Sequence, residues 1–157
     1  MAHLALRRPL VGLAVFVVAV AAVAVIGSLS ALSASSDYEQ LRTPSWAPPS
    51  WLFGPVWTAL YVMIALSGWL FWKRHGTGPE LVLFGVQLVL NAAWTPLFFA
   101  AGRYGLALVD IIALLVVIIA LIVAFARKHR VAALLLVPYL AWVGFATALN
   151  ASIVSLN

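Results

Sequence analysis

The chain has no cysteine and few charged residues, and each shortage excludes certain classes of protein. Without cysteine it forms neither disulfides nor thiolate metal sites. Charged residues make up 8% of its 157 residues, whereas a soluble domain carries roughly 25%. Hydrophobic residues make up 66%, and the mean hydropathy is +1.13. This composition predicts a protein that lies in a lipid bilayer.

Patterns typical of catalytic and metal sites are also lacking. The sequence shows no Ser/His/Asp set and no pair of carboxylates suited to acid–base catalysis. Its three histidines fall near the ends of expected helices on one side, so an iron in a pocket on the other side would lack a histidine ligand: they are His3, His75 and His129. We therefore expect no metal site, no required cofactor and no conventional enzyme.

Five apolar runs are long enough to cross a bilayer, which takes about 20 residues. They occupy residues 10–32, 51–72, 80–101, 104–126 and 131–154. None has the period-2 alternation of a transmembrane barrel strand. Thr77, three residues before Glu80, fits a capping box that starts the third helix. The pattern predicts an all-α membrane protein in which residues 1–157 form a single bundle of five transmembrane helices.

The first run also has features of a secretory signal, because Arg7 and Arg8 precede it. The apolar core of such a signal is about 7 to 15 residues long. The run at residues 10–32 is longer, so we expect it to be retained as the first span.

Lysine and arginine are distributed unevenly between the two sides of this bundle. Seven of the nine lie in the N-terminal tail, the second-to-third loop and the fourth-to-fifth loop, and only Arg42 and Arg103 lie on the other side. The positive-inside rule then places the N-terminus in the cytoplasm and the C-terminus outside. The net charge of +5 is thus explained by basic residues at the cytoplasmic membrane surface. We therefore expect no nucleic-acid partner.

The longest expected loop, residues 33–50, is rich in proline and tryptophan. It ends in RTPSWAPPS, where three prolines exclude a helix interior and stiffen the backbone. Such a loop is suited to be a lid. Trp46 and Trp51 are equally typical of anchors at the membrane surface.

Polar and aromatic side chains recur at helical spacing on three spans, which places each set near one face. Amides in lipid need partners, so the amides of these sets should face the bundle interior. They serve either hydrogen bonds between helices or a ligand pocket with aromatic walls, and the convergence of three stripes favours a pocket. The stripes are Trp57, Tyr61, Gly68 and Trp72 on the second span, Gln87, Asn91, Trp94, Thr95 and Phe98 on the third, and Tyr139, Trp142, Ala146 and Asn150 on the fifth.

Two further features leave alternatives open. Asp110 is the one acidic residue well within a span, and it can pair with Arg103, hydrogen-bond to a neighbouring helix or take part in proton chemistry. Gly144 and Ala148 have a spacing that lets helices approach closely, either within the fold or across a dimer.

Four segments, in this order, resemble the tryptophan-rich sensory proteins (TspO/MBR family), relatives of the mitochondrial translocator protein or peripheral benzodiazepine receptor. They are DYEQLRTPSWAPPSW with GPVWT, LNAAWTPLFF, ALVD, and PYLAWVGFATALN. The resemblance implies a five-helix, homodimeric receptor of the bacterial cell envelope. It also implies that porphyrins such as protoporphyrin IX, and benzodiazepine- or isoquinoline-like ligands, bind in a pocket closed by the first loop.

The resemblance also implies a set of ligand-binding residues. The family motifs carry over to Tyr38, Pro48, Trp57, Asn91, Trp94, Trp142 and Ala146. The helical projection adds Tyr61 and Asn150, and Trp46 belongs to the underside of the lid. The first span carries no family motif, so we expect it to contribute helix packing.

Two other family properties bear on activity. Some members promote light-dependent breakdown of protoporphyrin, for which Trp57 and Trp142 are the photochemical candidates. Vertebrate relatives end in a sterol-recognition pattern, whereas ATALNASIVSLN has neither tyrosine nor a basic residue, which argues against cholesterol binding.

Three functions are compatible with the sequence: a tetrapyrrole receptor or sensor, a transporter of a tetrapyrrole or another small apolar molecule, and a structural or partner-binding membrane protein. The shortage of ionisable groups within the spans argues against proton-coupled transport.

Overall fold

The computed structural model describes residues 2–157, without the side chains of residues 2–7, 31–37 and 50. The described chain is built from helices: α1 (Ala2–Gln40), η1 (Ser50–Leu52), α2 (Phe53–His75), α3 (Pro79–Thr95), η2 (Pro96–Ala100), α4 (Tyr104–Ala126) and α5 (Arg130–Leu156). Five segments are long and apolar enough to cross a membrane. The expected five-span, all-α membrane protein is confirmed.

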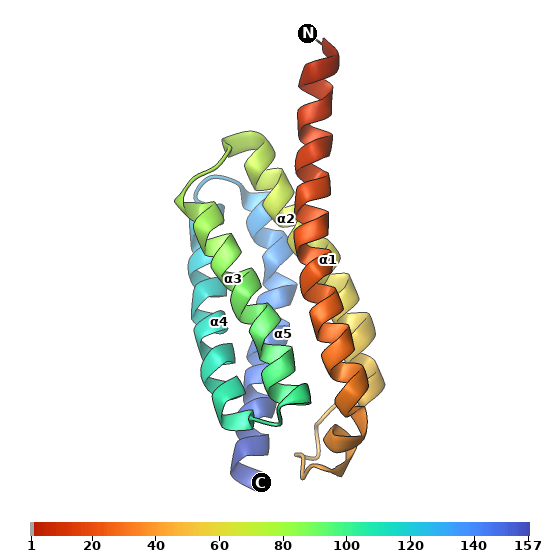
Figure 1. Cartoon of the computed structure of the whole chain (residues 1–157). Coiled ribbons are helices and arrows are strands. Elements are labelled where there is room, and N and C mark those ends of the chain that lie inside the picture. Colours follow the sequence, from red (N-terminus) through yellow and green to blue (C-terminus); the bar gives the residue numbers. More distant parts are fainter. Residues whose placement is uncertain (1) are drawn as a thin grey trace.

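The five long helices form a closed ring. α1 packs against α2 and α3, α2 against α5, α5 against α4, and α4 against α3 with η2. The two termini lie at opposite ends of this bundle (Figure 1). An odd number of spans requires this arrangement, but which end faces the cytoplasm stays a prediction.

The centre of the ring is filled by large apolar side chains. On α4 the fully buried side chains recur every three or four residues, at the period of one helix face. This face packs on α5 and α3, and Phe125 stacks on Phe71 of α2 with ring centroids 4.2 Å apart. The buried side chains of α4 are Ala107, Ile111, Leu114, Ile118, Leu121 and Phe125.

The first helix is longer than the sequence predicted. Residues 33–40, expected to belong to the lid loop, continue α1 to Gln40, so the irregular part is residues 41–49. The expected boundary followed the fall in hydropathy, which marks where a helix leaves lipid rather than where it ends. The segment SASSDYEQ contains neither glycine nor proline, the strongest helix breakers. The first proline after it is Pro44.

The third span is two helical segments rather than one. α3 ends at Thr95 and continues as the π-helical η2, whose wide turn is closed by a hydrogen bond of 2.8 Å from Ala101 N to Pro96 O. The expected tight reversal follows: Gly102 has a left-handed φ of 62°, and Arg103 N donates to Leu97 O at 2.9 Å. A left-handed glycine just past the last turn is a common way to end a helix, and here the closing bond reaches one residue further back than usual, after the wide π turn of η2.

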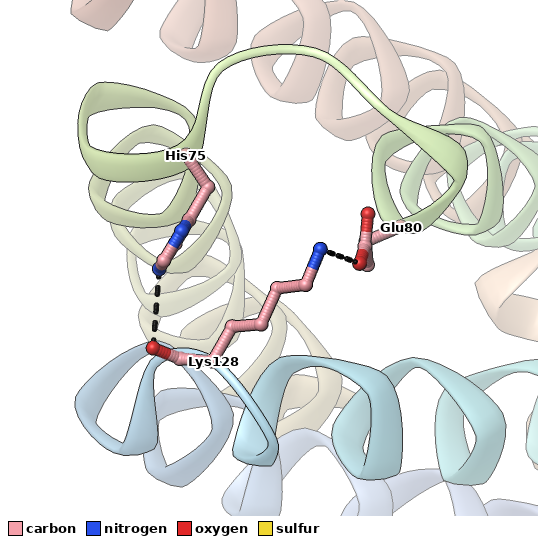
Figure 2. Close-up of polar contacts among 3 residues, drawn as sticks. All are labelled: His75, Glu80 and Lys128. Atoms are coloured by element: carbon pink, nitrogen blue, oxygen red, sulfur yellow. Dashed lines mark hydrogen bonds and ion pairs between the residues drawn. The ribbon is translucent and has the colours of Figure 1, made fainter.

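The expected capping box at Thr77 is wrong. Gly78 is the N-cap of α3, no side chain caps it, and Pro79 takes the first helical position, where its missing N–H costs nothing. Glu80 instead pairs with Lys128, Oε1 to Nζ 2.6 Å. Figure 2 shows that His75 also contacts Lys128, with His75 Nε2 3.1 Å from the backbone oxygen of Lys128. These contacts join the α2–α3 loop to the α4–α5 loop.

Candidate functional site

A chain of polar side chains crosses the middle of the ring. The Tyr139 hydroxyl donates to Gln87 Oε1 at 2.8 Å, and Asn91 Nδ2 donates to the Tyr139 hydroxyl at 2.8 Å. The Tyr61 hydroxyl approaches Asn91 Oδ1 at 3.4 Å. Gln87, Asn91 and Tyr139 are buried, as the stripes predicted. Three helices, α2, α3 and α5, are therefore joined inside the bundle by side-chain hydrogen bonds.

A second polar link lies nearer the lid. Trp94 Nε1 donates to Asn150 Oδ1 at 3.0 Å, and Asn150 Nδ2 donates to the backbone oxygen of Tyr104 at 2.8 Å. Asn150 is fully buried, and both ends of its amide have partners. Asn150 thus joins α3, α4 and α5. Of the two roles considered for a buried amide, hydrogen bonding between helices and ligand binding, it has the first.

Aromatic rings fill the bundle around these links. Trp57 stacks on Tyr61 with centroids 5.5 Å apart and lies 6.4 Å from Trp94. Phe53 contacts Trp142 edge-on at 5.8 Å. Phe53 also meets Tyr38 at 5.4 Å. Aromatic rings therefore crowd the centre of the three stripes, where the sequence predicted a pocket, and they come both from the stripes and from Phe53 and Tyr38.

The open space lies to one side, between α1, α2 and the junction of α3 with η2. A cavity of about 110 Å³ has Trp57 and Tyr61 on one wall and small residues of α1 on the opposite wall. Its lining residues are Ala24, Gly27, Ser28, Phe53, Gly54, Trp57, Thr58, Tyr61, Thr95 and Phe99. Trp57 and Tyr61 are the predicted ligand residues that line it. Others lie outside the lining: Tyr38, Trp46, Pro48, Asn91, Trp94, Trp142, Ala146 and Asn150.

This cavity adjoins a groove on the outer side of α1 and α2. The groove, about 260 Å³ in volume, shares Ala24, Thr58 and Tyr61 with the cavity. Its other lining residues are Val17, Val20, Ala21, Val62, Ala65 and Leu66. Val17 and Val62 are exposed on the membrane-spanning surface, so the groove faces lipid. The cavity is therefore next to the bilayer rather than next to water.

The lid connects α1 to η1 and α2, and on the way it contacts α5 at the end of the bundle. Tyr38 is buried, and its hydroxyl donates to Pro48 O at 3.0 Å. Burial raises the pKa of this hydroxyl, which lies beyond the span Arg8–Ser30. Trp46 remains 46% exposed and meets Phe145 edge-on at 5.5 Å. Trp46 thus packs on α5, and the aromatic cluster beneath the lid separates it from the cavity.

Sequence reasoning missed the contribution of α1 to the site. We expected this helix only to pack, yet Ala24, Gly27 and Ser28 form a wall of the cavity. A Cβ on Gly27 would lie 3.5 Å from the Tyr61 hydroxyl, so the backbone of α1 comes close to the aromatic wall. The signal was the spacing of these small residues, three and four apart on a valine-rich span.

Three buried polar atoms have no hydrogen-bond partner among the described residues: Gln87 Nε2, Asp110 Oδ2 and Trp142 Nε1. Of the three roles left open for Asp110, the pair with Arg103 is not formed among the described residues, where the ion pair observed is Lys128 with Glu80. A Cβ on Gly144 would meet no described atom within 4 Å. Gly144 therefore does not serve a close approach within the fold, and its role in a dimer stays a prediction.

Comparisons with known proteins agree with this architecture. Residues 14–156 match the model of the TspO/MBR family. The chain is 47% identical to the tryptophan-rich protein TspO of Chlorobaculum tepidum over 79% of this chain and 81% of that protein. It is 44% identical to the translocator protein of Homo sapiens, over 72% and 70%. It is 36% identical to the tryptophan-rich sensory protein of Cereibacter sphaeroides, over 76% of each.

The family match covers nearly the whole chain and includes every helix that lines the cavity. The five spans agree with the five-helix fold that the resemblance implied. The protein is therefore an integral, multi-pass membrane protein of sensor or receptor type, and it belongs to the TspO/MBR family.

Proposed function

We propose that this protein is a receptor or sensor of the bacterial cell envelope that binds a porphyrin of the protoporphyrin IX type. Other flat aromatic molecules, such as benzodiazepine- or isoquinoline-like compounds, would use the same site. The observation that carries the proposal is the cavity between α1, α2 and η2, whose wall is the stacked pair Trp57 and Tyr61. An aromatic face with few polar groups is typical of sites for apolar ligands.

The polar groups at the edge of the cavity would orient such a ligand. Thr58 and Thr95 line the cavity, and the Tyr61 hydroxyl is held toward Asn91. Trp94 and Trp142 support the wall from behind, through Trp57 and Phe53 respectively. In this arrangement Trp57 touches the ligand, and the other tryptophans position the rings that do.

The size of the cavity indicates that binding requires movement. Its volume of about 110 Å³ is below the roughly 300 to 1,000 Å³ of sites for drug-sized molecules. The wall formed by α1 is the natural one to yield, because alanine, glycine and serine bury little surface against α2. The adjoining groove would let an apolar ligand arrive from the lipid.

The test is a titration of the purified protein with protoporphyrin IX, followed by quenching of tryptophan fluorescence. Gly54 lines the cavity, and a Cβ there would meet no described atom within 4 Å. We therefore expect Gly54→Leu to narrow the cavity without disturbing the packed interior. Gly144→Leu is the matched control, because the same side chain enters open space away from the cavity.

We expect saturable quenching for the wild type and for Gly144→Leu, with the affinity at least about tenfold weaker in Gly54→Leu because the ligand and the new side chain compete for one space. Trp57→Leu should weaken binding as well, since it removes the aromatic face. Equal, non-saturating curves for all four proteins would mean partitioning into detergent, and would overturn the proposal.

Transport is the remaining alternative for the same site. It requires the ligand to leave on the opposite side, and would be detected as protoporphyrin flux into sealed vesicles. The cavity adjoins a lipid-facing groove, and Asp110, the acidic residue within a span, is not part of its lining. Both observations favour binding from the bilayer over proton-coupled transport.

A further inference from the structure

A second groove lies at the opposite end of the bundle from the lid, where α1 passes the end of α2 and the start of α3. Its volume is about 500 Å³. It has two polar residues, Arg8 and Thr77, and is otherwise apolar. The lining residues are Arg8, Val11, Gly12, Val15, Phe16, Trp72, Thr77 and Leu81.

The polar and apolar parts of this groove are arranged along the membrane normal. Arg8 begins the first membrane span, and Thr77 lies in the α2–α3 loop. Val11 and Val15 follow Arg8 three and seven positions later, on the same helix face. At 1.5 Å per residue, the groove extends about 10 Å along α1 from Arg8, which is roughly two thirds of the 15 Å hydrocarbon depth of one leaflet.

The floor of the groove is firmly packed. Trp72 lies directly on Gly12, where a Cβ would overlap its ring. Phe16 contacts Phe84 of α3 edge-on at 5.5 Å and Trp72 at 6.4 Å. These rings leave little freedom for the side chains to close the groove. Val11 and Val15 are each 61% exposed on a surface that faces lipid, so an acyl chain is the molecule that meets them.

The charge at this end favours an anionic headgroup. Lys73 and Arg74, in the last turn of α2, are exposed beside the groove. The one acidic residue of the α2–α3 region, Glu80, is already paired with Lys128. A guanidinium such as that of Arg8 matches the geometry of a phosphate group, and basic residues at the membrane surface attract anionic lipids.

We propose that this groove binds one anionic phospholipid, in the leaflet on the side of the α2–α3 loop. Arg8 contacts the phosphate, the Thr77 hydroxyl donates to it, and one acyl chain lies along Val11, Val15 and Phe16. This lipid site is independent of the proposed receptor function, because the groove shares no lining residue with the cavity between α1, α2 and η2.

The experiment is native mass spectrometry of the purified protein, titrated with phosphatidylglycerol or phosphatidylcholine that carry the same acyl chains. Arg8→Gln removes the charge, and Arg103→Gln, an exposed cation at the other end, is its control. Val15→Trp fills the groove. Val18→Trp is the matched control, because Val18 is 67% exposed and belongs to neither groove on α1.

We expect the wild type to retain one phosphatidylglycerol in preference to phosphatidylcholine. Arg8→Gln should weaken phosphatidylglycerol binding about fivefold, the effect of one basic residue near the membrane surface, and leave phosphatidylcholine binding unchanged. Val15→Trp should weaken the binding of both lipids, and both control variants should behave as the wild type.

Three outcomes would overturn the proposal. If Arg8→Gln and Arg103→Gln bind phosphatidylglycerol with equal affinity, Arg8 does not contact the phosphate. If Val15→Trp and Val18→Trp retain lipid equally, the acyl chain does not lie in this groove. A change of oligomeric state in Val15→Trp, without a change in lipid retention, would make the groove a contact between copies of this chain.

Discussion

A disulfide between α1 and α3 would test whether the cavity must widen to admit its ligand. A Cβ on Gly27 lies 3.9 Å from Thr95 Cβ, within the roughly 3.5 to 4.5 Å that disulfides span. The chain has no native cysteine, so Gly27→Cys combined with Thr95→Cys permits one defined intramolecular bond. It closes a loop of roughly 70 residues, which in the chain-entropy treatment adds about 4 kcal/mol to the free energy of unfolding. We expect the Tm of the oxidised protein to lie about 8 to 16 °C above that of the reduced protein.

The assay compares protoporphyrin IX binding by the oxidised and reduced forms of this same double variant. The two forms carry the same added side chains and differ in whether α1 can separate from α3. A lock on the closed cavity of about 110 Å³ lowers the fraction of binding-competent protein, and the apparent Kd rises in proportion. We expect binding about tenfold weaker or more after oxidation, with full recovery on reduction.

Each single-cysteine variant should bind equally well under both conditions. If the oxidised double variant, with its bond verified, binds with the same Kd and the same association rate as the reduced one, α1 does not open the site. The reasoning from cavity volume would then be refuted.

Three other variants test the packing and the chemistry of the site. Tyr139→Phe removes the two 2.8 Å hydrogen bonds to Gln87 and Asn91 and should cost about 1 to 3 kcal/mol in reversible detergent unfolding; an unchanged stability would make this network dispensable. Gly68→Val should cost a similar amount, about 1 to 3 kcal/mol, because a Cβ there lies 2.6 Å from Phe84 Cζ; the Gly144→Val control should stay within about 0.5 kcal/mol of the wild type, and equal melting curves would contradict the close packing. Under illumination, Trp57→Phe should slow the bleaching of bound protoporphyrin followed by absorbance, whereas Trp142→Phe should not, because only Trp57 lines the cavity; equal bleaching in all three proteins would exclude Trp57.

Hydropathy and helical period were sufficient to predict the five spans and the direction in which their polar residues face. A bilayer requires each span to be long and apolar, and it makes an unpaired amide on the lipid side unfavourable. These requirements act on each helix by itself, so one sequence reveals them. Gln87, Asn91 and Asn150 are accordingly buried, and they form hydrogen bonds to other helices.

The end of α1 and the place of the cavity depend on information that periodicity does not carry. The fall in hydropathy after Leu32 indicates where the helix leaves the bilayer. The helix itself continues beyond that point, to Gln40. The stripes showed which faces converge. Whether space remains between them depends on the volumes of the side chains that meet there. Phe53, which belongs to no stripe, packs on Phe99 and Trp142. The opening lies where α1 contributes Gly27 instead of a large side chain.

The distribution of contacts supports the inference that α1 is the wall that yields to a ligand. Hydrogen bonds inside the ring join the other four helices: Ser67 Oγ of α2 donates to Ala132 O of α5 at 2.7 Å, and Asn91 joins α3 to α5. Beside the cavity, α1 instead meets its neighbours through Ala24 and Gly27, whose small surfaces lose few dispersion contacts when the helices separate.

At the other end of α1, contacts hold the helix in place. Trp69 Nε1 donates to Pro9 O at 2.7 Å, and Trp72 packs on Gly12. α1 is also fastened at its lid end, where Tyr38 packs on Phe53, Phe98 and Phe99. We therefore infer that its loosely packed middle, near Gly27, bends away from α2 and α3 between two fastened ends, which widens the cavity and its adjoining groove together. The proposed lipid site lies at the fastened end near Pro9, so a phospholipid on Arg8 would strengthen that end without occupying the receptor site. The disulfide at Gly27 acts between the two fastened ends, where such bending produces the larger displacement and a lock has the greatest effect.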